Sequence, residues 1–106
     1  MKRQSIELDN LFPQDIKQYY EVAHEYLELQ PENFRGAFKL SQMAWALADR
    51  WNDILANISK LDITKGTTKS ELQKYCYGKY RQMKLIHEHC RSIWRLGEDI
   101  NKFNAK

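Results

Sequence analysis

The fold of this chain is decided by residues 37–61, which read AFKLSQMAWALADRWNDILANISKL. Apolar residues recur in this stretch at alternating spacings of three and four, at Ala37, Leu40, Ala44, Leu47, Trp51, Ile54, Ile58 and Leu61. This alternation predicts an α-helix with one continuous apolar seam, as in coiled coils. We expect the helix to cover residues 32–60 and to be opened by Pro31, because the first position of a helix needs no backbone N–H.

A second apolar face runs along the same predicted helix. Phe34, Phe38 and Trp45 lie off the main seam. A helix that is apolar on two faces needs two neighbouring elements to cover it. We expect the helix that precedes it in the chain to cover these three aromatic residues.

The two neighbouring helices are recognised by the same spacing. The first covers residues 13–30, begins at Pro13 and has an apolar face made of Ile16, Tyr20, Ala23 and Leu27. The other covers residues 69–103 and follows a capping box formed by Thr68 and Glu71. Its seam consists of Leu72, Cys76, Lys79, Met83, Ile86, Cys90, Ile93, Gly97 and Ile100. Lys79 and Gly97 are the two residues that break this apolar pattern.

The predicted fold class is all-α. We expect one helical domain over residues 1–106, an antiparallel three-helix up-down bundle with residues 1–12 as an N-terminal arm. At ~1.5 Å per residue the three helices would be about 27, 42 and 52 Å long. Because the first is the shortest, we expect it to cover only the first half of the second. The second and third helices would then protrude as a two-helix hairpin over residues 55–82.

Composition excludes several classes of protein. Hydrophobic residues make up 42% of the 106 residues and charged residues 29%, which is typical of a globular domain and not of a disordered chain. No apolar run approaches the roughly 20 residues of a membrane span. The first residues contain no apolar core of a signal peptide, so we expect a cytoplasmic protein. Cys76 and Cys90 are too far apart on one helix to pair, and we expect two buried, reduced thiols.

Signatures of catalysis are missing from the sequence. There is no glycine-rich phosphate loop, no GxSxG motif and no HExxH motif. His87 and Cys90 are one helical turn apart and could share a metal ion, but a structural zinc site needs four ligands. The simpler interpretation is that His87 and His89 lie beside the core and that Cys90 is part of it. We therefore expect no enzyme, no metal site and no cofactor.

Charge is distributed unevenly along the chain. Residues 1–60 carry seven Lys and Arg against nine Asp and Glu, whereas residues 61–106 carry ten against five. The cations gather at the expected hairpin tip with Tyr77 among them, at Lys65, Lys69, Lys74, Lys79, Arg81 and Lys84. Lysine and arginine neutralise phosphates, and a tyrosine ring can stack on an unpaired base. This pattern predicts a module that contacts nucleic-acid backbone, single strands in preference to a specific duplex sequence.

Two other interpretations remain open at this point. Lysines on an exposed helix are often only a solvated face. The regular seams and the three tryptophans also suit a protein–protein interaction module, such as an adaptor, an inhibitor or an assembly factor, without any nucleic-acid role. In either case we expect a second copy or another protein as a partner. Salt dependence of binding to a generic single strand would separate the two functions.

Overall fold

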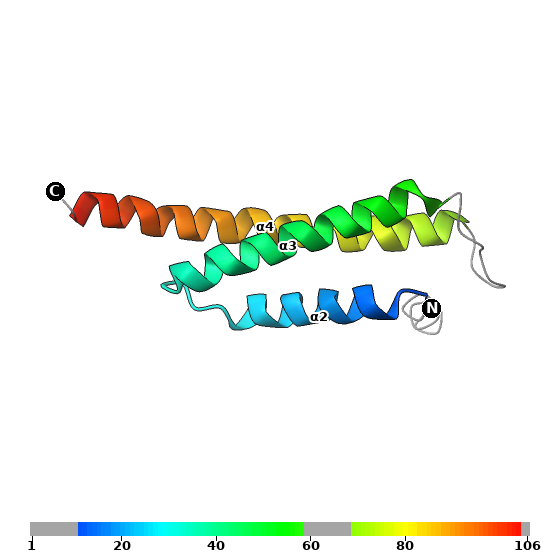
Figure 1. Ribbon diagram of the computed structural model, residues 1–106, viewed down its shortest axis with the longest axis horizontal. Helices are drawn as coiled ribbons and strands as arrows, with labels where there is room; N and C mark the ends of the chain where they lie inside the picture. Colours follow the sequence, from blue (N-terminus) through cyan, green and yellow to red (C-terminus); the bar gives the residue numbers. More distant parts are fainter. Residues whose placement is uncertain (1–10, 59–68, 105–106) are drawn as a thin grey trace.

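The computed structural model describes residues 11–58 and 69–104, and all regular secondary structure in these ranges is helical. The helices are α2 (Pro13–Glu28), α3 (Phe34–Ala56) and α4 (Lys69–Asn104). They lie along one another as a bundle, and each runs against the direction of the helix before it (Figure 1). The prediction of an all-α bundle is confirmed. Within the described ranges, no helix is both long and apolar enough to cross a membrane.

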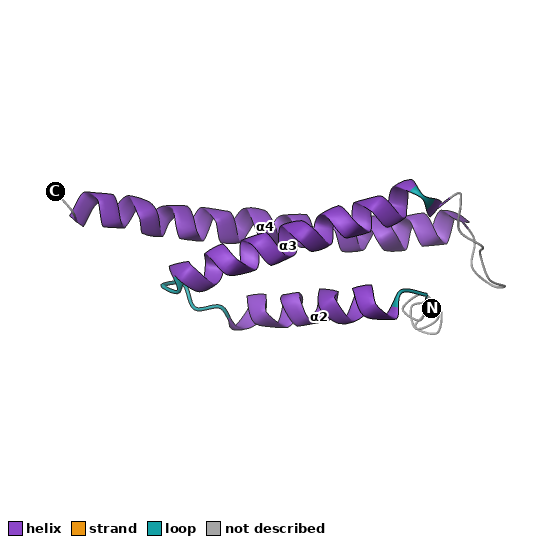
Figure 2. Ribbon diagram, viewed as in Figure 1, coloured by secondary structure: helices purple, strands orange, loops and turns teal. Residues whose placement is uncertain are grey.

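Helix α3 begins at Phe34, two residues later than the predicted start at residue 32. Asn33 is the N-cap, and its side-chain oxygen accepts a hydrogen bond from the backbone N–H of Gly36 at 2.9 Å. Figure 2 shows the loop between α2 and α3 in teal. Pro31 belongs to this loop and precedes the cap, so the expectation that it opens the second helix is wrong. An asparagine cap satisfies one of the free N–H groups of the first turn, which a proline cannot do.

The core lies mainly between α3 and α4. Every position of the predicted α3 seam up to Ile58 is buried, and Leu61 lies outside the described residues. In α4 the buried seam positions are Leu72, Cys76, Met83, Ile86, Cys90 and Gly97. The shorter α2 adds only Ile16 and Val22 to the buried set. The two long seams therefore pack against each other, and α2 covers one side of the pair.

The second apolar face of α3 packs against α4 and not against α2. The ring centroids of Phe38 and Trp94 lie 5.2 Å apart, and those of Trp45 and His87 lie 4.9 Å apart. Phe34 lies directly against Gly97. The expectation that the first helix covers these three aromatic residues is therefore wrong.

Helix α2 also reaches further along α3 than its length alone suggested. Phe12, just before α2, packs edge-on against Trp51 with ring centroids 5.8 Å apart. The Nε atom of Arg50 donates to Asp15 Oδ1 at 3.1 Å. The expectation that the first helix covers only the first half of the second is wrong for this reason. What extends past both other helices is the C-terminal part of α4 (Figure 1); the predicted tip at residues 59–68 lies outside the described residues.

The two glycines of α4 should respond to alanine in opposite ways. A Cβ atom at Gly97 would collide with the Phe34 side chain, whereas one at Gly78 would meet nothing within 4 Å. Alanine is favoured over glycine inside a helix by about 1 kcal/mol. We expect Gly78→Ala to raise the free energy of unfolding by about that amount and Gly97→Ala to lower it. Urea denaturation of the two variants measures both effects, and equal changes of the same sign would contradict the Phe34 contact.

Trp51 and Trp45 form a second matched pair on α3. Trp51 is 0% exposed between Phe12 and Tyr75, while Trp45 is 55% exposed. Truncation of a buried tryptophan costs about 3–5 kcal/mol. We expect Trp51→Ala to lower the free energy of unfolding by that amount and Trp45→Ala by clearly less. Chemical denaturation followed by circular dichroism would reveal an error in the helix register if the two losses were equal.

Candidate nucleic-acid interface

An exposed basic face runs along the first half of α4. Lys74, Tyr77, Arg81 and Lys84 follow one another at spacings of three, four and three, so they share one side of the helix. All four are exposed, on the side opposite the buried residues Cys76 and Met83. Because the apolar seam of α4 packs against α3, these four residues point toward solvent. We call these four residues the basic face. Lys69 is also exposed, but it lies five residues before Lys74 and therefore on another side of α4.

Lys79, another predicted cation of α4, lies elsewhere. Its Nζ atom is 4.5 Å from the ring centroid of Tyr19, 5.0 Å from that of Tyr75 and 5.6 Å from that of Tyr20. It is half-buried at the contact between α2 and α4. Cation–π contacts of this kind stabilise a protein by about 0.5–1 kcal/mol at exposed sites and more when desolvated. Lys79 therefore holds α2 on α4, and we remove it from the predicted interface.

The tyrosines around Lys79 form an apolar surrounding for its ammonium group. Burial raises the pKa of the Tyr19 hydroxyl, and the neighbouring Tyr20 raises it further. The rings of Tyr19 and Tyr20 meet edge to face with centroids 5.2 Å apart. Their negative ring faces attract the Lys79 ammonium in these contacts. This explains how a lysine can occupy a seam position.

Aromatic rings accompany the basic face itself. Tyr77 is 48% exposed, and its ring centroid is 6.2 Å from that of Tyr80. The Nζ atom of Lys84 lies 5.8 Å from the Tyr80 ring centroid. An exposed ring next to flexible cations can stack on a base while the cations contact phosphates. Lys65, the remaining predicted site residue, lies outside the described residues.

Sequence reasoning missed the continuation of this face. Arg91 and Arg95 are exposed and follow Lys84 at the same helical spacing, with Glu88 between them and Lys84. The predicted site ended at Lys84 because it was defined by the many lysines near the turn and not by helical spacing. The 3.6-residue period, extended along the helix, would have found both arginines.

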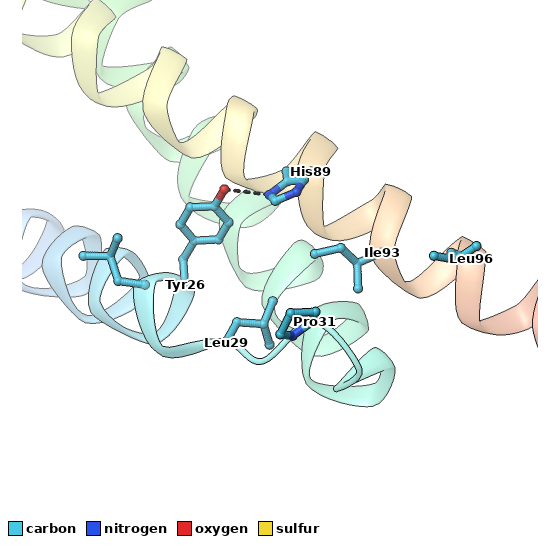
Figure 3. Close-up of a pocket in the computed structure, with 7 residues that line it drawn as sticks. Tyr26, Leu29, Pro31, His89, Ile93 and Leu96 are labelled. Atoms are coloured by element: carbon cyan, nitrogen blue, oxygen red, sulfur yellow. Dashed lines mark hydrogen bonds between the residues drawn. The ribbon is translucent and has the colours of Figure 1, made fainter.

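The histidines of α4 have structural partners. His87 Nδ1 donates to the backbone carbonyl of Ser41 on α3 at 2.8 Å. His89 Nδ1 and the Tyr26 hydroxyl of α2 share a hydrogen bond of 2.6 Å (Figure 3). Within residues 11–58 and 69–104, no three His, Cys, Asp or Glu side chains are placed to hold a metal ion. The two rings connect α4 to its neighbours, one to each.

Both thiols are shielded from solvent. Cys76 and Cys90 are free cysteines in the core. Burial raises the pKa of the Cys76 thiol from 9.0 to about 11, and burial also raises the pKa of Cys90. Since the thiolate is the reactive form, both groups are inert near neutral pH. They fill space in the seam and offer no nucleophile.

The raised Cys76 pKa predicts a loss of stability in alkali. A thiol whose pKa is higher in the folded state contributes stability below pH 9, and this contribution is lost as the pH rises through about 11. Tyr19, whose pKa is also raised, adds to the same loss. We expect the wild-type protein to lose more free energy of unfolding between these pH values than Cys76→Ala, which keeps Tyr19. Urea denaturation at each pH checks this, and parallel curves for the two proteins would contradict it.

Comparison of the chain with protein-family models, with curated proteins and with solved structures found no match to any of them. The function therefore has to be argued from the residues and their arrangement.

Proposed function

We propose that this protein is a non-enzymatic module that binds the backbone of nucleic acid through the basic face of α4, single strands in preference to a specific duplex sequence. The observation that carries the proposal is the exposure of Lys74, Arg81 and Lys84 on one side of α4 beside the half-exposed Tyr77. Cations gathered on one face of a helix are the electrostatic footprint of such proteins.

The absence of acids in this part of the chain supports the proposal. Between Glu71 and Glu88 the sequence contains four cations and no Asp or Glu. An ordinary solvated helix face tends to mix both signs, since oppositely charged residues one turn apart stabilise it. Glu71 and Glu88 lie at the two ends of this run, one turn from Lys74 and Lys84, and no acid lies between them to compete with phosphate for the cations.

The proposed contact is electrostatic and tolerant of sequence. Each cation that neutralises a phosphate releases a condensed counterion, which makes binding weaker as salt rises. Tyr77 would stack on one unpaired base, and stacking accepts any base because each has a π face. Reading a duplex sequence also needs side chains that recognise adenine and cytosine, and the basic face offers no amide or acidic group for these two bases.

The proposal also includes the parts of the prediction that lie beyond the described residues. We propose that α3 and α4 are joined as an antiparallel hairpin and that the tip of this hairpin carries Lys65 next to the basic face. The proposal assigns the protein to the cytoplasm, where the free thiols of Cys76 and Cys90 stay reduced. A module with so few cations gains strength when several copies bind along one strand.

Fluorescence anisotropy of a labelled oligo-dT tests the proposal. Lys69 and the three cations of the basic face together imply a slope of about −3 in a plot of log affinity against log salt on a single strand. We expect a variant with Lys74→Gln, Arg81→Gln and Lys84→Gln to bind more weakly and to reduce that slope by about 2.

A variant with the same loss of charge elsewhere provides the control. Lys17, Arg35 and Lys39 are exposed on α2 and α3. Their replacement by Gln removes three charges without touching the basic face, so the slope should stay near that of the wild-type protein. If both triple variants lost the same affinity, binding would depend on net charge alone and not on the basic face. No binding at about 50 mM salt would refute the proposal.

A protein–protein interaction module is the second candidate. It is supported by large apolar side chains that remain in solvent at one end of the bundle, where Leu27 is 80% exposed and Phe103 is 78% exposed. Such a patch marks an interaction site more often than a scattered single residue does. The two candidates use different faces of α4, so one protein can combine them.

A further inference from the structure

A row of aromatic and cationic side chains runs along the edge of α4 that borders α3. Its members follow one another at alternating spacings of three and four, and they are Tyr77, Tyr80, Lys84, His87, Arg91 and Trp94. The row begins within the basic face, at Tyr77 and Lys84. It reaches α3 at His87, whose Nδ1 atom donates to the backbone carbonyl of Ser41 at 2.8 Å. The row therefore leads from the basic face to the contact between α3 and α4.

An open pocket lies where this row meets α3. Gln42 and Trp45 of α3 line it on one side, and His87 and Arg91 of α4 line it on the other. Its volume of about 510 Å³ is within the range of pockets that take up organic groups. Trp45 is 55% exposed, and its ring centroid lies 4.9 Å from that of His87. Because the hydrogen bond to Ser41 holds the His87 ring, this wall of the pocket is formed before any ligand binds.

The lining of the pocket selects a ligand that is both flat and anionic. Trp45 offers a large exposed ring on which another ring can stack, and the exposed guanidinium of Arg91 can donate two parallel hydrogen bonds to a phosphate. Asp49 and Glu88 lie one turn from Trp45 and Arg91 and are not part of the lining. The charged group of the lining is thus a cation. A nucleotide carries the matching pair of groups, a base and a phosphate.

We propose that this pocket binds one unpaired base of the same nucleic-acid strand that contacts the basic face, with the base stacked on Trp45 and its phosphate held by Arg91. The inference rests on the proposed function and gives the bound strand a second stacking site besides Tyr77. Tyr77 and His87 are ten residues apart, which is about 15 Å along the helix axis. At about 3.4 Å per nucleotide of a stacked strand, about four nucleotides cover this distance. Lys84 lies between the two sites, so one short strand can contact all three.

Replacement of Trp45 tests the stacking site. In anisotropy titrations with labelled oligo-dT, we expect Trp45→Ala to weaken binding about 5- to 150-fold, the loss that one stacked base accounts for. Trp45→Phe should keep most of the affinity because it keeps a ring. Phe103→Ala is the matched control, since Phe103 is 78% exposed on α4 but lies off the row, and it should bind like the wild-type protein. Trp45 is largely exposed, so helical circular dichroism should stay unchanged in all three variants.

An abasic oligonucleotide of the same length separates stacking from phosphate attraction. It keeps the phosphates and lacks the bases, so Trp45→Ala and the wild-type protein should bind it equally. Arg91→Gln should weaken binding to both oligonucleotides and reduce the salt slope by about 0.7. Lys17→Gln removes the same charge from the exposed side of α2 and should leave the slope nearly unchanged.

Tryptophan fluorescence reports on the pocket directly. Trp51 is 0% exposed and Trp94 is half-buried, so stacking should quench mainly Trp45. We expect oligo-dT to quench the wild-type protein and not Trp45→Phe, although both bind it. Thymidine monophosphate lacks the contacts with the basic face and should quench only at much higher concentration. Quenching by both ligands at equal concentration would assign the pocket to a free nucleotide and overturn the inference.

The outcomes separate this inference from the proposed function. If the wild-type protein binds oligo-dT and Trp45→Ala binds it equally well, the stacking site is refuted while the basic face stands. Equal losses of Trp45→Ala on oligo-dT and on the abasic oligonucleotide would also refute it. No binding of oligo-dT by the wild-type protein at about 50 mM salt would refute both.

Discussion

The packing of the α3 seam against the α4 seam is the constraint on which the rest of the structure depends. It buries most of the core, including Trp51, Met83 and both thiols, and each large side chain removed from water stabilises the fold by about 1.5–3 kcal/mol. Because a helix has only one orientation that buries such a seam, everything else on α4 is placed by it. The basic face points outward for this single reason.

Most of this arrangement could be predicted from spacing alone. The alternation of three and four identified the seams of both long helices, and the burial of Ala44, Trp51 and Cys90 follows directly from it. The same period put Lys74, Arg81 and Lys84 on one exposed face. Periodicity works here because it reports which residues share a side of a helix, and that is a local property of the backbone.

The partner of each side could not be predicted in the same way. Phe34, Phe38 and Trp45 formed a clear second face, but spacing does not say which neighbour covers it. That choice depends on contacts between distant residues, such as the room that Gly97 leaves for Phe34. The two residues that broke the α4 pattern both mark such contacts. Gly97 leaves room for the Phe34 ring of α3, and Lys79 lies over the Tyr19 ring of α2. Each break in the apolar pattern of α4 therefore lies at a contact with a neighbouring helix.

The small share of α2 in the core has a consequence for how the molecule opens. Helices α3 and α4 follow one another in the chain and hold most of the buried side chains, whereas α2 holds only Ile16 and Val22 among them. Elements that bury little apolar surface are the first to detach from a native protein. We therefore regard α3 and α4 as one cooperative unit and α2 as a separate, less stable one. Its release would free the Lys79 ammonium from the Tyr19 and Tyr20 rings and expose the side of Trp51 that Phe12 covers, so the charge and the apolar surface shown to solvent both depend on whether α2 is docked.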